Sequence, residues 1–223
     1  MTPRRLVLAG WTLLALAWLV ANPPFGGPDE ASHYLRSLQV GRGHLITQAR
    51  PGAARGETER QVAWNRQFTY AMHVPPGMAP HDYECWTSDR RADAGCLDGF
   101  RPPKRAFTTT APVGNYQPLP YLLPGLATRA AHSPAGALRL ARALNALLSL
   151  ALLYIALRMA WSPDVGPISL LGLLVAVTPM AIFCASMLTG SGPEIAAGIA
   201  FAASALRLRR DESCARSFNV WAA

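Results

Sequence analysis

Residues 143–161, ALNALLSLALLYIALRMAW, form a long apolar stretch in which Arg158 is the only charged residue. A helix needs about 20 predominantly apolar residues to cross the roughly 30 Å hydrocarbon core of a bilayer, and this stretch is long enough. Its one charge lies near an end, where an arginine side chain can reach the lipid headgroups. The stretch therefore predicts a transmembrane helix.

Three more apolar stretches lie on either side of it: LVLAGWTLLALAWLVA (6–21), ISLLGLLVAVTPMAIFCASML (168–188) and a 12-residue stretch at 195–206. The last would cross only with its flanks, from about 193 to 208. Pro179 lies inside the third stretch and predicts a kinked helix. The fold class expected is an α-helical integral membrane protein of about four transmembrane helices.

Residues 1–21 allow two interpretations, because a secretory signal peptide also has a basic start and an apolar middle. Leu19, three positions before Ala21, is large for a signal-peptidase site. The first transmembrane helix is the interpretation we carry forward, and the later apolar stretches keep the protein in the membrane under either one.

The arginines near the ends of the apolar stretches predict the orientation. Arg4 and Arg5 place the N-terminus in the cytoplasm, and four crossings return the C-terminal arginines to the same side. The expected organisation is an N-terminus with helix 1 (1–22), a large extracytoplasmic loop between helices 1 and 2 (23–133), helices 2–4 (134–210) and a cytoplasmic tail (211–223). The compartment expected is the bacterial plasma (inner) membrane, crossed several times.

The net charge is +8, and all but one of the 21 basic residues are arginine. A basic composition can indicate nucleic-acid binding. Here the arginines are scattered between apolar stretches, without aromatic residues spaced among them for base stacking. We therefore expect no nucleic-acid partner, and membrane lipid instead.

Cys85 and Cys96 are the cysteines of the large loop, with ten residues between them. In an oxidising compartment this spacing favours a disulfide. A zinc site is the alternative, with His81 as a further ligand, but a structural zinc usually takes four ligands. Cys184 and Cys214 are expected to be free thiols.

The sequence PPFGGPDEASHY (23–34) follows the first apolar stretch directly. Pro28 suits the first position of a helix, and Asp29 and Glu30 in its first turn are stabilised by the helix dipole. Apolar residues then recur at helical spacing, which predicts a juxtamembrane amphipathic helix over 28–41 that lies on the outer membrane surface.

The end of the loop, residues 115–131, turns apolar again. Pro118, Pro120 and Pro124 exclude a long regular helix there. Tyr116 and Tyr121 are residues typical of a membrane interface, so a short interfacial or re-entrant element is expected.

Four segments together carry a family resemblance: PPFGGPDEASHY, NYQPLPYLLPG, LRLARALNALLSLALLYIAL and TPMAIFCASMLTGSGPEIAAGIAF. Their order and motifs resemble the DUF2142 family of bacterial polytopic membrane proteins, whose members open with a similar P-P-x-x-x-P-D-E-x-x-H pattern after the first span. The resemblance covers the ends of the chain well and the middle of the loop poorly. Members are longer and have more spans, so the chain resembles a truncated N-terminal part.

That family in turn resembles the GT-C glycosyltransferases, which use polyprenyl-phosphate sugars as donors and carry an acidic residue in the first outer loop. The resemblance implies that Asp29, with Glu30 beside it, is the catalytic carboxylate. A carboxylate at the membrane surface could take the proton of the acceptor hydroxyl, or hold a divalent cation (Mg or Mn) near the donor phosphate.

Four further residues have two interpretations each. His33 could tune the carboxylates or share a metal, or be a hydrogen-bonded surface histidine. Arg139 and Arg142, one helical turn apart, could bind the donor's lipid phosphate or contact ordinary headgroups. Glu194 could be a second acid of the same outer cavity or a helix-start charge.

Two functions stay open. The first is a GT-C-like glycosyltransferase, or its N-terminal fragment, that transfers a sugar on the extracytoplasmic side. The second is a non-catalytic scaffold or interaction partner in cell-envelope assembly. A transporter is disfavoured, because the apolar stretches carry almost no charge at mid-membrane depth.

Overall fold

The computed structural model describes residues 2–49, 56–80, 91 and 101–210. These residues divide into two compact units. Of the described residues, unit 1 contains 2–18, 146–187 and 191–210, and unit 2 contains those between 19 and 145 together with 188–190. The helices α1 (Pro3–Ala21) and α6 (Pro134–Ala160) each supply residues to both units.

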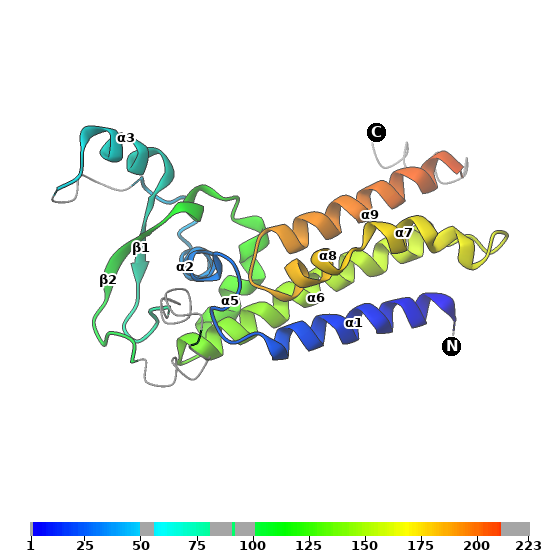
Figure 1. Cartoon of the computed structure of the whole chain (residues 1–223), viewed down its shortest axis with the longest axis horizontal. Coiled ribbons are helices and arrows are strands. Elements are labelled where there is room, and N and C mark those ends of the chain that lie inside the picture. The colour runs from blue at the N-terminus through cyan, green and yellow to red at the C-terminus, as the bar shows by residue number, and fades with distance from the viewer. Residues whose placement is uncertain (1, 50–55, 81–90, 92–100, 211–223) are drawn as a thin grey trace. The chain divides into compact units, whose positions relative to one another are not determined.

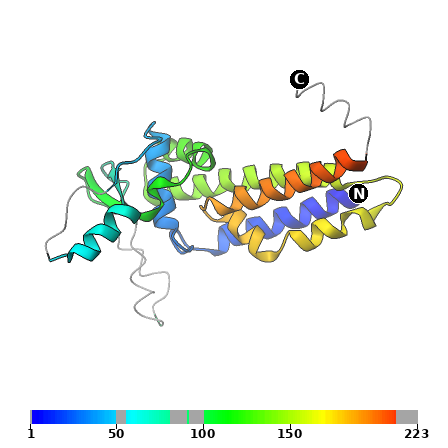
Figure 2. The same cartoon turned by 90° about the horizontal axis from the view of Figure 1, so that it is seen from above.

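Unit 1 is a helical bundle, in which parts of α1 and α6 pack with η4 (Pro167–Leu170), α7 (Leu171–Ala176), α8 (Pro179–Ser186) and α9 (Ser191–Arg210). Figure 2 shows α1 in blue, α6 in green and α9 in orange running alongside one another. The core of the bundle is formed by buried side chains from all of these segments: Trp11, Ala15, Leu153, Ala156, Leu157, Leu170, Leu173, Val177, Ile182, Ala196, Ala200 and Ala203.

The third apolar stretch is broken rather than kinked. Its two halves, α7 and α8, meet at an angle of 66°. Thr178 is extended there (ψ 162°), and its side chain caps α8 by accepting a hydrogen bond from the Ala181 amide at 3.2 Å. Pro179 has no amide hydrogen and disfavours a helical conformation at the residue before it, so a new helix starts at the proline.

Two helices of the described chain, α1 and α6, are long and apolar enough to cross a membrane, and the bent pair α7–α8 would make a third. The sequence led us to expect about four. The difference is α9, a helix of 20 residues that carries Glu194 in its first turn and Arg207, Arg209 and Arg210 at its end.

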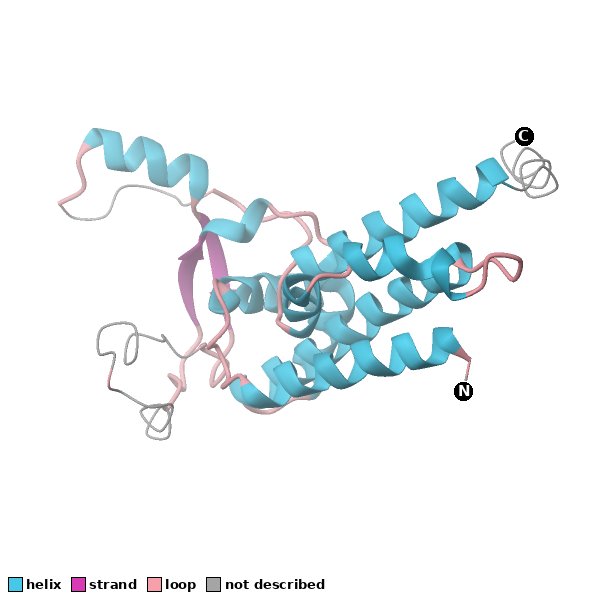
Figure 3. Ribbon diagram, turned by 45° about the vertical axis from the view of Figure 1, so that its right-hand side comes forward, coloured by secondary structure: helices cyan, strands magenta, loops and turns pink. Residues whose placement is uncertain are grey.

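Unit 2 is a mixed unit around one buried helix, α2 (Glu30–Gly41). Its other elements are α3 (Glu59–Phe68), β1 (Tyr70–Val74), β2 (Phe107–Ala111), η2 (Pro112–Asn115), η3 (Leu119–Tyr121) and α5 (Leu122–Ala130). The two strands pair antiparallel, with Met72 opposite Thr109 (Figures 1 and 3).

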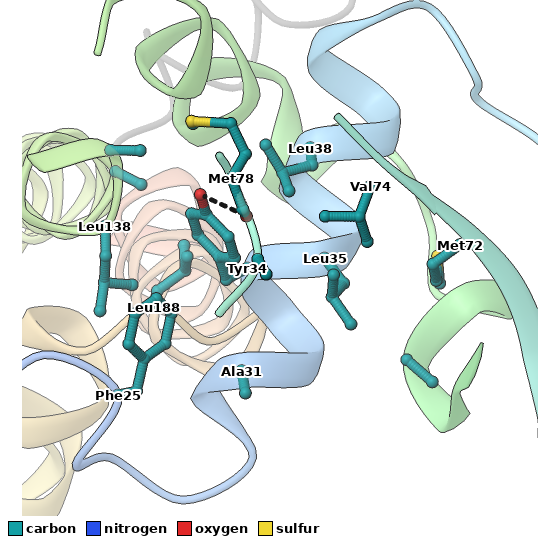
Figure 4. Close-up of a cluster of buried hydrophobic side chains, with 14 of the residues drawn as sticks. Phe25, Ala31, Tyr34, Leu35, Leu38, Met72, Val74, Met78, Leu138 and Leu188 are labelled. Carbon is teal, nitrogen blue, oxygen red and sulfur yellow. Dashed lines mark hydrogen bonds between the residues drawn. The ribbon is translucent and has the colours of Figure 1, made fainter. Parts of the chain in front are cut away.

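The helix α2 occupies the core of unit 2. Tyr34 and Leu38 are fully buried on it, and Tyr34 donates a hydrogen bond to the Met78 carbonyl at 3.2 Å (Figure 4). The Phe25 ring packs edge-on against the Tyr34 ring, with 5.2 Å between centroids. Apart from Ser32, every residue from Glu30 to Gly41 is buried.

The amphipathic helix expected here is thus surrounded by the rest of unit 2 on nearly all sides, and its position relative to the membrane stays a prediction. Its polar residues form internal hydrogen bonds instead of a solvated face. Arg36 donates to the Tyr116 carbonyl at 2.7 Å and to the Leu45 carbonyl at 2.8 Å, and the Gln39 amide donates to the His73 carbonyl at 2.6 Å. A buried polar group is tolerated when it is hydrogen-bonded in this way.

The helix α5 packs against α2 at a glycine–glycine contact. A Cβ added at Gly125 would lie 2.6 Å from the Gly41 nitrogen and 2.8 Å from the Ser37 carbonyl oxygen. No side chain fits between the two backbones there. The prolines of 115–131 do exclude one long helix, since the segment forms η3 and the short α5.

Candidate functional site

The site is built on the turn between α1 and α2. Two of its non-glycine residues have left-handed backbone conformations, Phe25 (φ 62°) and Asp29 (φ 53°). Such conformations cost about 1–2 kcal/mol per residue and need surrounding contacts to hold them. Phe25 is held by burial, with 2% of its surface exposed. On either side of Asp29, the Gly27 amide donates to the Glu30 carboxylate at 3.4 Å and the Glu30 amide donates to the Gly27 carbonyl at 3.3 Å.

Glu30 is fully buried, and both of its carboxylate oxygens accept two hydrogen bonds. Oε1 accepts from Arg142 Nε at 2.6 Å and from the Leu188 amide at 3.1 Å. Oε2 accepts from Arg142 Nη2 at 2.5 Å and from the Gly27 amide at 3.4 Å. This is a bidentate arginine–carboxylate pair, the strongest geometry for such an interaction. Both oxygens of the Glu30 carboxylate are therefore engaged inside unit 2.

The hydrogen bonds described for the Arg142 guanidinium all lie inside unit 2. Besides Glu30, it donates to the Asn22 carbonyl at 2.8 Å and to the Pro23 carbonyl at 2.9 Å, and 1% of its surface is exposed. It is thus directed at the Pro-Asp-Glu turn, which does not fit the lipid-phosphate role expected from the sequence. Arg139, one turn earlier on α6, is exposed and keeps its guanidinium available at the surface.

The carboxylate of Asp29 is presented outward. Asp29 is the N-cap of α2, but its side chain makes no capping hydrogen bond and the residue is exposed. Its backbone carbonyl instead accepts the His33 amide at 3.1 Å. The two neighbouring acids therefore differ in their surroundings: Glu30 is buried and bonded inside the turn, and Asp29 is exposed.

His33 is buried beside these carboxylates, not at the surface. Its Nδ1 lies 2.6 Å from the Tyr121 hydroxyl, and the two rings stack at 5.9 Å between centroids. Burial lowers the pKa of His33, and the negative charges of Asp29 and Glu30 oppose that shift. His33 is thus held as a neutral imidazole in contact with a tyrosine. Sequence reasoning placed Tyr121 at a membrane interface and missed this contact.

The other expected site residues lie elsewhere. Glu194 is exposed in the first turn of α9 and belongs to unit 1. Cys184 is half-buried on α8. The predicted Cys85–Cys96 disulfide and Cys214 lie outside the described residues.

The donor set around the turn does not fit a metal site by itself. Among the residues that the structure describes, no three His, Cys, Asp or Glu side chains are grouped to hold an ion. Glu30 has both oxygens bonded, which leaves the Asp29 carboxylate and the second ring nitrogen of His33 as the remaining donors of this set. A magnesium ion prefers about six oxygen ligands, so these residues do not hold one by themselves.

The comparisons with known proteins give one match. A model of the DUF2142 family, described as "Predicted membrane protein (DUF2142)", matches residues 12–223. No curated protein and no solved structure matches the chain. The family match covers nearly the whole sequence, from the second half of α1 onward, including the Pro-Asp-Glu turn. The chain therefore belongs to the DUF2142 family of predicted membrane proteins.

Proposed function

We propose that this chain is a GT-C-like membrane glycosyltransferase, or its N-terminal part, that takes a sugar from a polyprenyl-phosphate donor on the extracytoplasmic side. One observation carries the proposal. Asp29 presents an exposed carboxylate from a strained left-handed position, directly after the first apolar helix. Strain of this kind clusters at functional sites, where the surrounding structure over-determines it.

In this reaction an acceptor hydroxyl attacks the anomeric carbon of the donor sugar. The bond between that carbon and the phosphate oxygen breaks, and polyprenyl phosphate leaves with the electron pair. The hydroxyl proton passes to the Asp29 carboxylate, which acts as the general base. Since the donor's tail lies in the bilayer, its reacting end meets residues close to the membrane surface.

The neighbouring residues would support that carboxylate. Glu30 and Arg142 hold the turn in place, which is the rigid support that a catalytic group needs. Neutral His33 adds no positive charge that would lower the basicity of Asp29. Arg139 is exposed and is the candidate for binding the leaving phosphate.

A four-span topology with both termini in the cytoplasm belongs to this proposal. Its support is the hydrogen bonding around Glu30, since Asn22, Arg142 and Leu188 meet there. Asn22 directly follows α1, Arg142 lies in the first half of α6, and Leu188 lies in the connection between α8 and α9. The end of α1, the start of α6 and the connection between α8 and α9 would lie on one side of a membrane if α7–α8 crosses as one broken helix. The helix α9 would then start on that side, and its crossing back is part of the proposal.

The test is Asp29→Asn in cells that depend on this protein for a surface glycan. Asparagine tolerates the left-handed conformation as aspartate does, so the variant removes the charge and keeps the fold. We expect normal protein level and loss of the glycan. The matched control is Asp164→Asn, an exposed acid in the connection after α6, which should leave the glycan unchanged.

A normal glycan with Asp29→Asn would refute the catalytic proposal. The chain would then be better described as a non-catalytic scaffold of cell-envelope assembly.

A further inference from the structure

Three arginines gather around a cavity in unit 1, away from the residues of the proposed reaction. The cavity has a volume of about 340 Å³ and is formed by the start of α1 and the last turns of α6. Its lining is Thr2, Arg4, Arg5, Leu8, Tyr154, Leu157 and Arg158.

The positive charge of this cavity is not neutralised by its own walls. None of the lining residues is acidic, and the first turn of α1 contains no acidic residue. The contacts that fix the arginines are neutral: the Arg4 guanidinium lies 5.2 Å from the Trp161 ring centroid, and Arg158 donates to the Tyr154 hydroxyl at 3.3 Å. The N-terminus of α1 adds the positive end of a helix dipole.

The chemical character of the lining residues indicates which class of ligand the cavity would bind. Arginine forks match the oxygen geometry of phosphate groups. Leu8 and Leu157 give the same cavity apolar wall, and it lies at the end of two helices that are apolar enough to cross a membrane. Basic pockets between transmembrane helices are typical sites for anionic lipid headgroups.

We propose that this cavity binds the phosphate of an anionic phospholipid, with Arg4, Arg5 and Arg158 as its ligands. A lipid held there would join the start of α1 to the end of α6. Free phosphate shares the headgroup chemistry but not the acyl chains, so a titration with each source distinguishes them. The inference does not depend on the glycosyltransferase proposal.

The experiment is native mass spectrometry of the full chain in detergent, titrated with phosphatidylglycerol or phosphatidylcholine. Each arginine near the membrane surface contributes about 1 kcal/mol to binding an anionic lipid, which corresponds to about a 5-fold change in affinity. We expect Arg4→Gln/Arg158→Gln to bind phosphatidylglycerol about 25-fold more weakly than the unmodified chain.

Two single variants complete the design. Arg5→Gln removes an exposed side chain, so it keeps the fold if the double variant does not, and it should bind about 5-fold more weakly. Arg209→Gln removes the same charge from the end of α9, outside the cavity, and should match the unmodified chain.

Equal losses in Arg5→Gln and Arg209→Gln would overturn the proposal, because they would indicate a general effect of net charge. Equal affinity for phosphatidylglycerol and phosphatidylcholine would overturn it as well. Binding of inorganic phosphate as tight as that of phosphatidylglycerol would overturn the choice of a lipid as the ligand.

Discussion

Replacing Arg142 with alanine should destabilise unit 2 more than any change to a surface arginine. Glu30 is fully buried and Arg142 is 1% exposed, so the variant leaves a buried carboxylate without its counter-charge. Removing one partner of such a pair typically costs about 3–5 kcal/mol. The Asn22 and Pro23 carbonyls lose their donors at the same time.

The assay is unfolding in mixed micelles of a mild detergent and sodium dodecyl sulfate, followed by circular dichroism. Arg139→Ala is the matched control, because Arg139 is exposed one turn earlier on the same helix, and it should change the free energy of unfolding by less than about 0.5 kcal/mol. In the double-mutant cycle with Glu30→Gln and Arg142→Met, the coupling energy should be at least about 1.5 kcal/mol. An Arg142→Ala loss as small as that of Arg139→Ala would refute the ion-pair reasoning.

Three further predictions concern unit 2. Gly125→Ala should destabilise by about 1–3 kcal/mol in the same assay, because its Cβ would meet backbone atoms, whereas Gly10→Ala in α1 has open space and should be neutral or stabilising. Asp29→Gly should have a free energy of unfolding equal to that of the unmodified chain or up to about 1 kcal/mol higher, since glycine adopts φ 53° without strain. The same variant should abolish function. A loss of stability would contradict the left-handed conformation of Asp29. Burial lowers the pKa of His33 in the folded chain. As the pH falls, His33 therefore takes up a proton at a higher pH in the unfolded chain than in the folded chain. Stability should therefore drop below about pH 6.5 and drop less in His33→Gln, and an identical pH dependence in both would count against the buried neutral imidazole.

The elements that sequence patterns predicted are those set by local composition. The apolar stretch at 6–21 lies within α1, the stretch at 143–161 lies within α6 up to Ala160, and the Pro-Asp-Glu segment does begin a helix, at Glu30. The break at Pro179 was visible as a proline in an apolar stretch, although the size of the bend was not.

What the sequence could not show depends on contacts between distant residues. Glu30 and Arg142 are 112 positions apart, and Arg36 is bonded to a carbonyl 80 positions away. A buried helix with polar residues and a solvated amphipathic helix have similar periodicity. The pattern of α2 therefore did not reveal that protein surrounds this helix on nearly all sides. The two neighbouring acids likewise look equivalent in sequence, and only the position of Arg142 separates their roles.

The catalytic role of Asp29 is tested most directly by sugar transfer by the purified chain in liposomes supplied with a labelled polyprenyl-phosphate sugar and an acceptor extract. We expect transfer by the unmodified chain and none by Asp29→Asn, with Asp164→Asn as active as the unmodified chain. Equal transfer by the unmodified chain and Asp29→Asn would contradict the assignment of Asp29 as the catalytic base.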